Sequence, residues 1–317
     1  MAYYIGIDIG GMSIKAGVVT EKGEIVCKDT IVPRVKDGQE AIAKDMFDLC
    51  EKVIGKAGLQ MGDVVGVGFG SPGTVDSERG VITFAANLGF NKFNLLKEFA
   101  KYWKIKTAVG NDANCAALGE TVFGSGKNRQ NAFFVTLGTG VGTGFIVDGK
   151  LLTGHKGGGT EGGHICIRMG GEKCSCGERG CWEAYASATA LIRQTEKALA
   201  LNPDSLMKET LEDGKVTGKT AFEAAKKGDK TALKVVNTYA KYVGTGVVLL
   251  TNVFRPEVVV IGGGVSNAGD FLLDRVRKYV SRHCFGNARI NPVPKIVKAE
   301  LGNDAGIVGA AALVMDL

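Results

Sequence analysis

The sequence predicts an α/β protein made of two similar domains that face each other across a cleft. Segments with strand and helix periodicity alternate along the 317 residues, and a strand–glycine loop–strand unit occurs twice, at residues 3–19 and 132–147. Such an internal repeat is typical of a duplicated domain. The first domain is expected to span residues 1–115, completed by a C-terminal helix at 303–317, and the second domain residues 116–302.

Apolar spacing and helix-terminating residues support the individual elements. Residues 39–56 carry apolar side chains on one helical face and are followed by Gly58. Asp229 is a suitable N-cap for a helix that extends to about Phe254. The other predicted elements are strands at 64–69 and 258–261, a strand, turn and helix over 107–120, and helices from Trp182 or Glu183 to Leu201, from 269 to 282 and from 304 to 317. Lysines between Lys215 and Lys241 are expected to form a solvated face.

Composition argues against several classes of protein. Apolar residues make up 45% of the chain and charged residues 23%, as in soluble globular proteins. Lysine and arginine number 39 against 33 acidic residues, which suits an anionic substrate, but no basic run with interleaved aromatics indicates nucleic-acid binding. We expect no membrane association, because the N-terminus lacks a signal peptide and no apolar stretch reaches transmembrane length. Eight cysteines, three of them closely grouped, favour a reducing, cytoplasmic compartment.

The two glycine loops are candidate phosphate-binding sites. Glycines let successive backbone N–H groups approach a phosphate without obstruction by a side chain. The first loop follows Asp8, which is placed to ligate a nucleotide-bound Mg²⁺ directly or through water. The alternative is that both loops are plain hairpin turns, and their repetition favours phosphate binding instead. The residues concerned are Gly10, Gly11 and Ser13 in the first loop and Gly138, Thr139 and Gly140 in the second.

A third glycine run, Gly262, Gly263 and Gly264, follows a fully apolar strand and precedes a predicted helix. Ligands bind at such positions in open α/β sheets, so the adenosine of a nucleotide is expected to lie across these glycines. Two other motifs are rejected. Residues 68–73 match a dinucleotide fingerprint but are followed by turn residues, and Gly218-Lys219-Thr220 lacks the earlier glycine of a Walker A loop.

The pair Asn111–Asp112 is the candidate catalytic feature. Asp112 is predicted to lie at the end of a strand and to open a helix between the two glycine-loop halves. There it is placed to accept the proton of an attacking hydroxyl while Asn111 fixes orientation, which suits phosphoryl transfer. The alternative is that Asp112 is simply the N-cap of that helix, and the spacing alone does not separate the two interpretations.

One histidine and three cysteines have the spacing of a closed zinc site. His164, Cys174, Cys176 and Cys181 lie within eighteen residues, although the chain has only three histidines. The alternatives are a disulfide pair or buried free thiols, and the short spacing of Cys174 and Cys176 disfavours a bridge between them. The adjacent carboxylates of Glu161 and Glu183 indicate that a structural zinc would shape a polar pocket.

These motifs together resemble those of the repressor–ORF–kinase (ROK) group of sugar kinases, within the hexokinase–actin superfamily. The resemblance covers essentially the whole chain and is carried by residues 8–11, 71–76, 86–90, 111–112 and 137–142 and by the zinc signature. It implies two ribonuclease-H-like, actin-like ATPase domains with an interdomain cleft. It also implies ATP with Mg²⁺ as phosphoryl donor, a structural Zn²⁺, and a homodimer or homotetramer.

The resemblance also implies roles for individual residues. Asp112 takes the role of catalytic base, and His164 both ligates zinc and contacts the sugar. The other implied sugar-binding residues are Gly73, Asn87, Asn111, Glu161 and Glu183, and Lys15 joins the two glycine loops and the third glycine run in nucleotide binding.

The details of the motifs favour a glucokinase of this group. Met12-Ser13 departs from the usual Thr-Lys, although Ser13 retains a hydroxyl, and Phe90 replaces a frequent Trp. Phosphorylation of glucose at the 6-hydroxyl is therefore the leading expectation. The alternatives are N-acetylmannosamine, N-acetylglucosamine or fructose as acceptor, a non-catalytic sugar-sensing regulator, and a polymerising actin-like ATPase.

Overall fold

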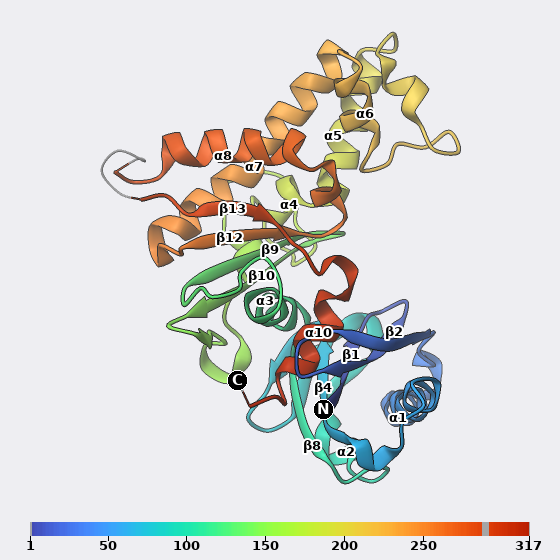
Figure 1. Ribbon diagram of the computed structural model, residues 1–317. Helices are drawn as coiled ribbons and strands as arrows, with labels where there is room; N and C mark the ends of the chain where they lie inside the picture. Colours follow the sequence, from blue (N-terminus) through green and yellow to red (C-terminus); the bar gives the residue numbers. More distant parts are fainter. Residues whose placement is uncertain (1, 287–291, 317) are drawn as a thin grey trace. The chain divides into compact units, whose positions relative to one another are not determined.

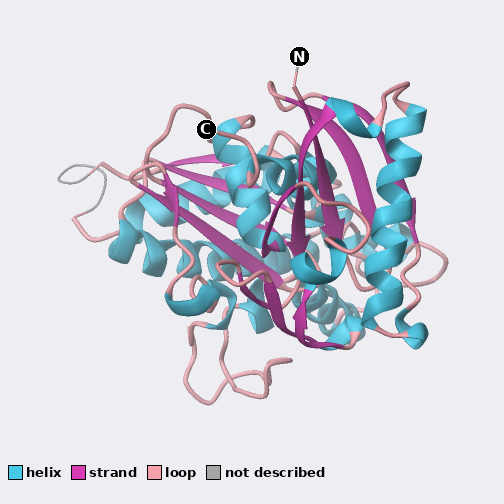
Figure 2. Cartoon of the chain, turned by 90° about the horizontal axis from the view of Figure 1, so that it is seen from below, coloured by secondary structure: helices cyan, strands magenta, loops and turns pink. Residues whose placement is uncertain are grey.

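The structure is a computed structural model that describes residues 2–286 and 292–316. Contacts between residues group the chain into two compact units. Unit 1 comprises Met1–Phe134, Gly144–Thr160 and Glu300–Leu317, and unit 2 comprises Val135–Thr143 and Glu161–Ala299. Each sheet is accompanied by helices (Figures 1 and 2). None of the helices in the described ranges combines the length and apolarity that a bilayer crossing requires.

Unit 1 is built on a mixed five-stranded sheet. Its strand order is β3 (Ile25–Ile31), β2 (Ile14–Thr20), β1 (Tyr3–Ile9), β4 (Val64–Ser71) and β8 (Lys106–Asn111). β1, β4 and β8 are parallel to one another, whereas β2 is antiparallel to both of its neighbours. Because the three parallel strands run the same way, the residues that follow them gather at one edge of the sheet.

One face of this sheet is covered by α1 (Gln39–Lys56). Alternation along β1 points Ile5, Ile7 and Ile9 into the same apolar core as Ile42 and Met46 of α1. The helix has the bounds predicted from its apolar spacing. The rest of this region consists of a three-stranded sheet, β5 (Thr74–Asp76), β6 (Val81–Ala85) and β7 (Phe90–Asn94), and the short helix α2 (Leu95–Phe99).

The other face of the sheet is covered by α10 (Ala305–Ala312), whose backbone lies directly against strand glycines. A Cβ atom at Gly6 would overlap the carbonyl oxygen of Ile307, and one at Gly68 would overlap that of Ala310. These strand glycines are therefore required by packing. The predicted helix at 303–317 is shorter than expected, since it ends at Ala312, and Leu317 lies outside the described residues.

α3 (Asp112–Val122) packs against α10, and its C-terminal end is fixed by a buried carboxylate. Gly309 of α10 meets the carbonyl of Cys115 so closely that any side chain there would overlap it. Glu120 is fully buried and accepts hydrogen bonds from the backbone N–H groups of Ser125 (3.0 Å), Glu300 (3.1 Å) and Leu301 (2.7 Å). These contacts place α3 in unit 1, whereas the expected division assigned residues after 115 to the second domain.

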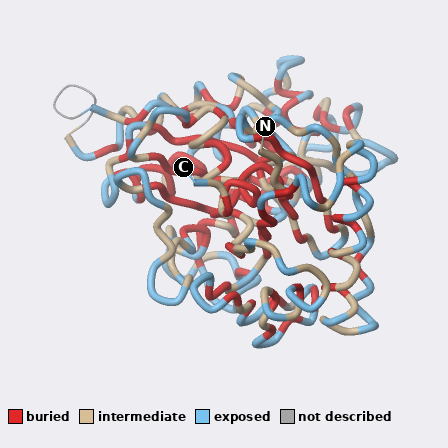
Figure 3. The backbone as a smooth tube through the Cα atoms, turned by 60° about the horizontal axis from the view of Figure 1, so that its bottom comes forward, coloured by how far each residue is buried: buried red, intermediate tan, exposed pale blue. Residues whose placement is uncertain are grey.

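Unit 2 is organised around the second five-stranded sheet. The strand order is β11 (Lys150–Leu151), β10 (Val141–Val147), β9 (Ala132–Leu137), β12 (Val258–Gly262) and β13 (Lys295–Lys298), of which β9, β10 and β11 lie wholly or partly in the sequence of unit 1. All five residues of β12 are buried, and Figure 3 marks the buried segments of the described chain in red. The helices of unit 2 are α4 (Glu183–Ala186), α5 (Ala188–Leu201), α6 (Thr220–Lys226), α7 (Lys230–Phe254) and α8 (Asp270–His283).

Two helix predictions in unit 2 are confirmed, and one is wrong. α7 begins after Asp229, whose side chain caps it by accepting from the N–H of Ala232, and α8 lies within one residue of its expected range. The helix predicted from 182 to 201 is divided, because Ser187 is extended and its hydroxyl instead caps α5 by accepting from the N–H of Ala190 (3.1 Å).

Short 3₁₀ helices connect many of these elements. They are η1 (Val35–Asp37), η2 (Met61–Asp63), η3 (Ala86–Leu88), η4 (His155–Gly157), η5 (Gly162–His164), η6 (Leu206–Thr210), η7 (Gly264–Ala268) and η8 (Gly302–Asp304). η3, η5 and η7 each carry residues that the sequence marks as candidates for a functional site.

Candidate active site

In unit 1, Asp8 lies near the carboxyl end of β1. It is directly opposite Lys15 of β2, and its Oδ2 atom is 3.5 Å from the lysine Nζ. On the α10 side of the sheet, a Cβ on Gly306 would lie 2.8 Å from the Asp8 carboxyl carbon. Burial raises the pKa of the Asp8 carboxyl, and the nearby Lys15 ammonium partly offsets that rise. Additional positive charge next to Asp8 would therefore stabilise its ionised form.

The first glycine loop is a tight turn between β1 and β2. The N–H of Gly10 donates to the carbonyl of Ser13 (2.9 Å). A side chain at Gly10 would come within 2.8 Å of that carbonyl, and one at Gly11 within 2.9 Å of the Asn87 Cβ atom. The structure thus brings the loop next to the exposed Asn87 of η3. The loop is a hairpin turn, and its close contacts leave no room for a side chain at either glycine.

Asn111 and Asp112 lie where β8 passes directly into α3, without the predicted turn. Asn111 is the N-cap: its Oδ1 accepts from the N–H groups of Ala113 (3.0 Å) and Asn114 (3.2 Å). The interpretation of Asp112 as the N-cap is therefore wrong. Asp112 is the first helical residue, and its Oδ1 accepts from the N–H of Ala113 (2.8 Å). The positive end of the helix dipole favours a negative charge at this position.

Further contacts join these residues to their neighbours in unit 1. The Asn111 Nδ2 donates to the carbonyl of Gly73 (3.1 Å), whose φ of +81° suits glycine. Burial, together with the nearby carboxylates of Asp112 and Asp8, raises the pKa of the Cys115 thiol well above its ordinary value. Both carboxylates therefore lie near one buried thiol, so unit 1 brings together the candidates that follow β1, β4 and β8.

In unit 2, the second glycine loop is held by the start of α5. The carbonyl of Gly138 accepts from the N–H of Ala188 (2.8 Å), and that of Thr139 accepts from the Thr189 hydroxyl (2.9 Å). A Cβ on Gly263 would lie 2.5 Å from the carbonyl oxygen of Leu137. Unit 2 thus places the second and third glycine runs side by side.

Glu183 connects this loop to the cysteine segment. Its Oε2 accepts from the N–H of Val141 (3.0 Å), and its Oε1 accepts from the Ser175 hydroxyl (2.7 Å). The Cys174 Sγ is 3.6 Å from the same Oε1. Gly140 leaves room for this carboxylate, because a Cβ there would collide with it. Both oxygens of Glu183 are therefore used to hold loops in place within unit 2.

His164, Cys174, Cys176 and Cys181 converge as predicted, with ligand atoms that all lie within 4.8 Å of one another. The Cys174 Sγ is 3.6 Å from the His164 Nδ1, and the Cys176 and Cys181 Sγ atoms are 3.7 Å apart. Ligands 2.3 Å from a tetrahedral zinc would be about 3.8 Å apart, so this spacing fits zinc. The cysteines of the described residues are free thiols, which excludes a disulfide here.

The remaining predicted residues of unit 2 lie beside this cluster. Because the Nδ1 of His164 faces Cys174, its Nε2 is directed elsewhere. Glu161 is exposed and precedes η5, and its carbonyl accepts from the N–H of His164 (3.0 Å). Trp182 is fully buried, and its indole N–H donates to the carbonyl of Tyr242 (2.8 Å), which anchors the segment to α7.

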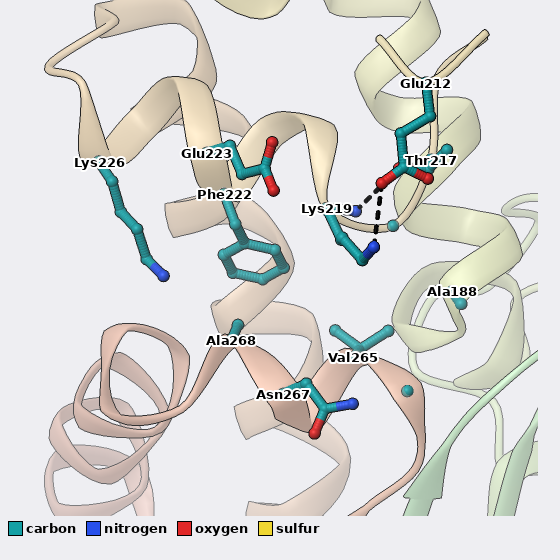
Figure 4. A pocket seen from close by; sticks show the side chains of 12 residues that line it. Ala188, Glu212, Thr217, Lys219, Phe222, Glu223, Lys226, Val265, Asn267 and Ala268 are labelled. Carbon is teal, nitrogen blue, oxygen red and sulfur yellow. Dashed lines mark hydrogen bonds and ion pairs between the residues drawn. The ribbon is translucent and has the colours of Figure 1, made fainter. Parts of the chain in front are cut away.

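Unit 2 also contains a pocket of about 390 Å³ that the sequence did not reveal. Its lining joins η7 and the start of α5 to the segment around α6 (Figure 4). The lining residues are Ala188, Glu212, Thr217, Gly218, Lys219, Phe222, Glu223, Lys226, Gly264, Val265, Asn267 and Ala268. Two residues of the motif rejected as a Walker A loop, Gly218 and Lys219, belong to this lining. They lie in the same pocket as Gly264 of the third glycine run. Lys219 and Lys226, expected only on a solvated face, also border this pocket.

Comparison with known proteins places these features in one family. The sequence model of the ROK family matches residues 4–317. A glucokinase from Halalkalibacterium halodurans is 38% identical over 98% of this chain and 94% of its own length. A glucokinase from Streptomyces coelicolor is 37% identical over 100% and 98%. A xylose repressor from Caldicellulosiruptor bescii is 30% identical over 98% of this chain, but this region is only 77% of that repressor.

Solved structures give the same result for the fold. The ROK glucokinase of Streptomyces griseus, solved with glucose and AMPPNP, superposes with a TM-score of 0.84 at 35% identity and covers 98% of this chain and 99% of its own. The ROK hexokinase of Thermus thermophilus superposes with a TM-score of 0.82 at 31% identity, covering 98% and 97%. The predicted actin-like α/β fold class is confirmed.

Proposed function

Because this chain belongs to the ROK family, we propose that it transfers the γ-phosphoryl group of ATP to the 6-hydroxyl of a hexose, with glucose as the preferred acceptor. The observation that carries the proposal is the similarity to glucokinases over essentially the full length of both proteins. The strand-end geometry of Asn111 and Asp112 supports it, since a carboxylate is placed at the end of β8 with its neighbour fixed as a helix cap.

In this proposal Asp112 is the general base. It accepts the proton of the 6-hydroxyl as that oxygen attacks the γ-phosphorus, and the leaving ADP carries away the bridging oxygen. Asn111 orients the acceptor and Asp112 together, because its side chain caps α3 and also binds the Gly73 carbonyl. Phosphoryl transfer needs mainly alignment and charge neutralisation, so few other groups are required.

The sugar-binding residues of the proposal are those that the sequence motifs indicate. They are Gly73, Asn87, Asn111, Glu161, His164 and Glu183. Carboxylate and amide oxygens accept from ring hydroxyls, and a site built from such acceptors discriminates against molecules that lack them. The runner-up acceptors are N-acetylmannosamine, N-acetylglucosamine and fructose.

We assign a structural zinc to His164, Cys174, Cys176 and Cys181. Burial raises the pKa of the Cys174 thiol, and that of Cys181 to about 12, so these thiols form thiolates only with a compensating cation. Because these four residues would fill all four positions of a tetrahedral zinc, the metal would hold the loop and would not activate water. Glu183 would orient the site from outside, through its contact with Cys174.

The nucleotide is assigned to three glycine segments. The residues assigned to the phosphates are Gly10, Gly11, Ser13, Lys15, Gly138, Thr139 and Gly140, and those assigned to the adenosine are Gly262, Gly263 and Gly264. The 390 Å³ pocket of unit 2 supports this assignment, because its size is in the range of small-ligand sites and Gly264 lines it. Mg²⁺, held by Asp8 directly or through water, would neutralise phosphate charge.

Two further proposals concern the state of the protein. The grouping of three cysteines at the spacing of metal ligands favours a cytoplasmic location. By resemblance to the family we expect a homodimer or homotetramer and no nucleic-acid partner.

The test is a coupled ADP-release assay with Mg-ATP and a panel of glucose, mannose, fructose, N-acetylglucosamine and N-acetylmannosamine. We expect kcat/KM for glucose to exceed that for every other sugar at least tenfold. Turnover on an N-acetyl sugar instead would retain the mechanism and overturn the choice of glucose. Zinc-loaded, folded protein that is silent on the whole panel, yet binds a sugar, would favour the alternative of a non-catalytic sugar-sensing regulator.

A further inference from the structure

A second depression of unit 2 lies between α7 and α8 and shares no residue with the proposed nucleotide pocket. The two helices pack side by side (Figure 1), and the depression between them has a volume of about 810 Å³. We call it the α7–α8 groove. It is lined by Asn237, Ala240, Lys241, Arg275, Lys278, Tyr279, Arg282 and His283. The lining thus includes lysines, arginines and an imidazole but no carboxylate.

The sequence segments that line this groove contain no acidic residues. No aspartate or glutamate occurs between Asp229 and Glu257, a stretch that contains all of α7, or between Asp274 and Glu300. On α8 the lining residues recur with helical spacing from Arg275 to His283, so they form one face. The two carboxylates of that helix are already paired, since Arg277 is 2.8 Å from Asp270 and 2.7 Å from Asp274.

The Arg275 side chain is held in place by uncharged groups. Its Nε donates to the Asn237 Oδ1 (2.9 Å), and its Nη1 donates to the carbonyl of Phe271. The guanidinium also lies over the Phe271 ring, 4.0 Å from the centroid. All these partners are uncharged. Among residues 2–286 and 292–316, Arg275 therefore has no ion-pair partner. A fixed cation of this kind is a prepared position for an anion, because little side-chain freedom remains to be lost on binding.

His283 is also fixed. Its ring stacks on Tyr279 with centroids 3.9 Å apart, and its Nδ1 is 2.8 Å from the Tyr279 carbonyl oxygen. A carbonyl can only accept, so Nδ1 carries the proton and Nε2 is the ring atom that a ligand can reach. Lys241, Lys278 and Arg282 complete the positive lining and have no ion-pair partner within residues 2–286 and 292–316.

We infer that the α7–α8 groove binds an anion carrying a row of phosphate groups, with an inorganic oligophosphate as its occupant. Arg275 and Arg282 are seven residues apart, or about 10 Å along the helix. The Arg275 guanidinium is hydrogen-bonded to and stacked on Phe271, on the side away from Arg282, so a chain of several phosphates spans the two cations better than a single phosphate does. Arginine pairs with phosphate oxygens in a bidentate manner, and lysine adds point charges. RNA fits less well, because His283 already stacks on one face of Tyr279, the only other aromatic residue of the lining.

The experiment uses the histidine signals of the full, zinc-loaded chain. Because the chain has only three histidines, imidazole NMR resolves His283, which His283→Gln assigns by loss of its signal. Tripolyphosphate is titrated without Mg²⁺ at constant ionic strength. We expect a saturable shift of the His283 signal, with orthophosphate at least tenfold weaker. This readout is local, so binding of tripolyphosphate at the nucleotide loops does not imitate it.

A matched pair of double variants separates a site from general attraction. Lys278→Ala with Arg282→Ala should raise the apparent Kd for tripolyphosphate at least tenfold. Lys208→Ala with Lys215→Ala removes the same charge from exposed positions elsewhere in unit 2 and should leave it unchanged. A non-saturating shift, equal losses in both double variants, or tighter binding of a single-stranded RNA of matched charge would each overturn the inference. The inference does not depend on the proposed kinase activity, which the sugar panel tests separately.

Discussion

At the scale of single residues, the aspartates near the carboxyl ends of β1 and β8 have different surroundings. Asp8 is largely removed from water and has one cationic neighbour, Lys15, whose ammonium only partly offsets the effect of burial on its pKa. Asp112 instead occupies the first turn of α3, where the helix dipole favours negative charge. The first environment suits a cation ligand, and the second suits a carboxylate that must remain ionised to accept a proton.

Asp112→Asn should lower kcat by about 10²–10⁴-fold, because an amide cannot accept the hydroxyl proton. Sugar binding and the melting temperature should change little, since Asn111 rather than Asp112 caps the helix. Steady-state kinetics and isothermal titration with glucose measure these effects. Asp63→Asn, an exposed carboxylate that accepts a backbone N–H of its own turn, is the matched control. A variant that keeps more than a tenth of the wild-type kcat would refute the assignment of the base.

Asp8→Asn should raise the melting temperature at pH 7 by a few degrees while it weakens Mg-nucleotide binding. The pKa of Asp8 is raised in the folded chain, so the folded state holds this proton more tightly than the unfolded state does. Its ionisation therefore costs stability at neutral pH, and that cost disappears as the pH falls toward 4. Melting curves from pH 7 down to pH 4 should show the two proteins converge. If Asp8→Asn melts below wild type at pH 7, the Lys15 pair outweighs burial.

At the scale of secondary-structure elements, α10 lies close to the sheet because two strand residues that face it are glycines. Gly6 and Gly68 lie on the face of the sheet opposite the isoleucine core, and both accept the helix backbone directly. Glycine weakens an isolated strand, so these positions are unfavourable until the helix is docked. Although α10 has only eight residues, its contact with these glycines should therefore contribute strongly to the free energy of unfolding of unit 1.

Gly68→Ala should lower the free energy of unfolding by about 3 kcal/mol or more, because the added methyl overlaps the Ala310 carbonyl and the backbone must move. Gly62→Ala is the matched control, since a Cβ there meets nothing within 4 Å. Its effect should stay within about 1 kcal/mol of wild type. Urea unfolding of both variants measures the difference. Equal stability of the two would show that α10 does not pack on the sheet as described.

At the scale of the whole molecule, the chain passes between the two units four times, and unit 1 contains both the first and the last described segments. The candidate residues are distributed accordingly: two aspartates and Asn111 in unit 1, the cysteine cluster and Glu183 in unit 2. The proposed zinc concerns only unit 2, so its removal should affect the two units unequally.

Cys176→Ser should reduce bound zinc from one per chain to nearly none and should loosen unit 2 selectively. Metal analysis gives the first result. Hydrogen exchange gives the second, with faster exchange around residues 161–187 and unchanged protection in β1 and β4. Cys166→Ser is the control, because this exposed cysteine is close in sequence but outside the cluster. Full zinc occupancy in Cys176→Ser would exclude Cys176 as a ligand.

The sequence was sufficient where local chemistry determines structure. The glycine turn after Asp8, the cap at Asp229 and the convergence of His164 with three cysteines all follow from nearby residues. It was insufficient where distant segments decide. The Thr217–Lys226 segment comes to border Gly264 through tertiary packing that no local periodicity encodes. The division after residue 115 was displaced for the same reason, since α3 packs against a helix almost two hundred residues away in sequence. The break at Ser187 has a local signal, the serine N-cap of α5, which the apolar periodicity on either side of it concealed.

The position of α10 at the end of the described chain has a consequence for biosynthesis. β1 and β4 leave the ribosome more than two hundred residues before the helix that covers their glycine face. At a rate of synthesis of about 5–20 residues per second, that face remains uncovered for on the order of ten seconds or more. Nascent chains therefore expose an apolar sheet surface throughout the synthesis of unit 2, and unit 1 becomes complete only after all of unit 2 has been made.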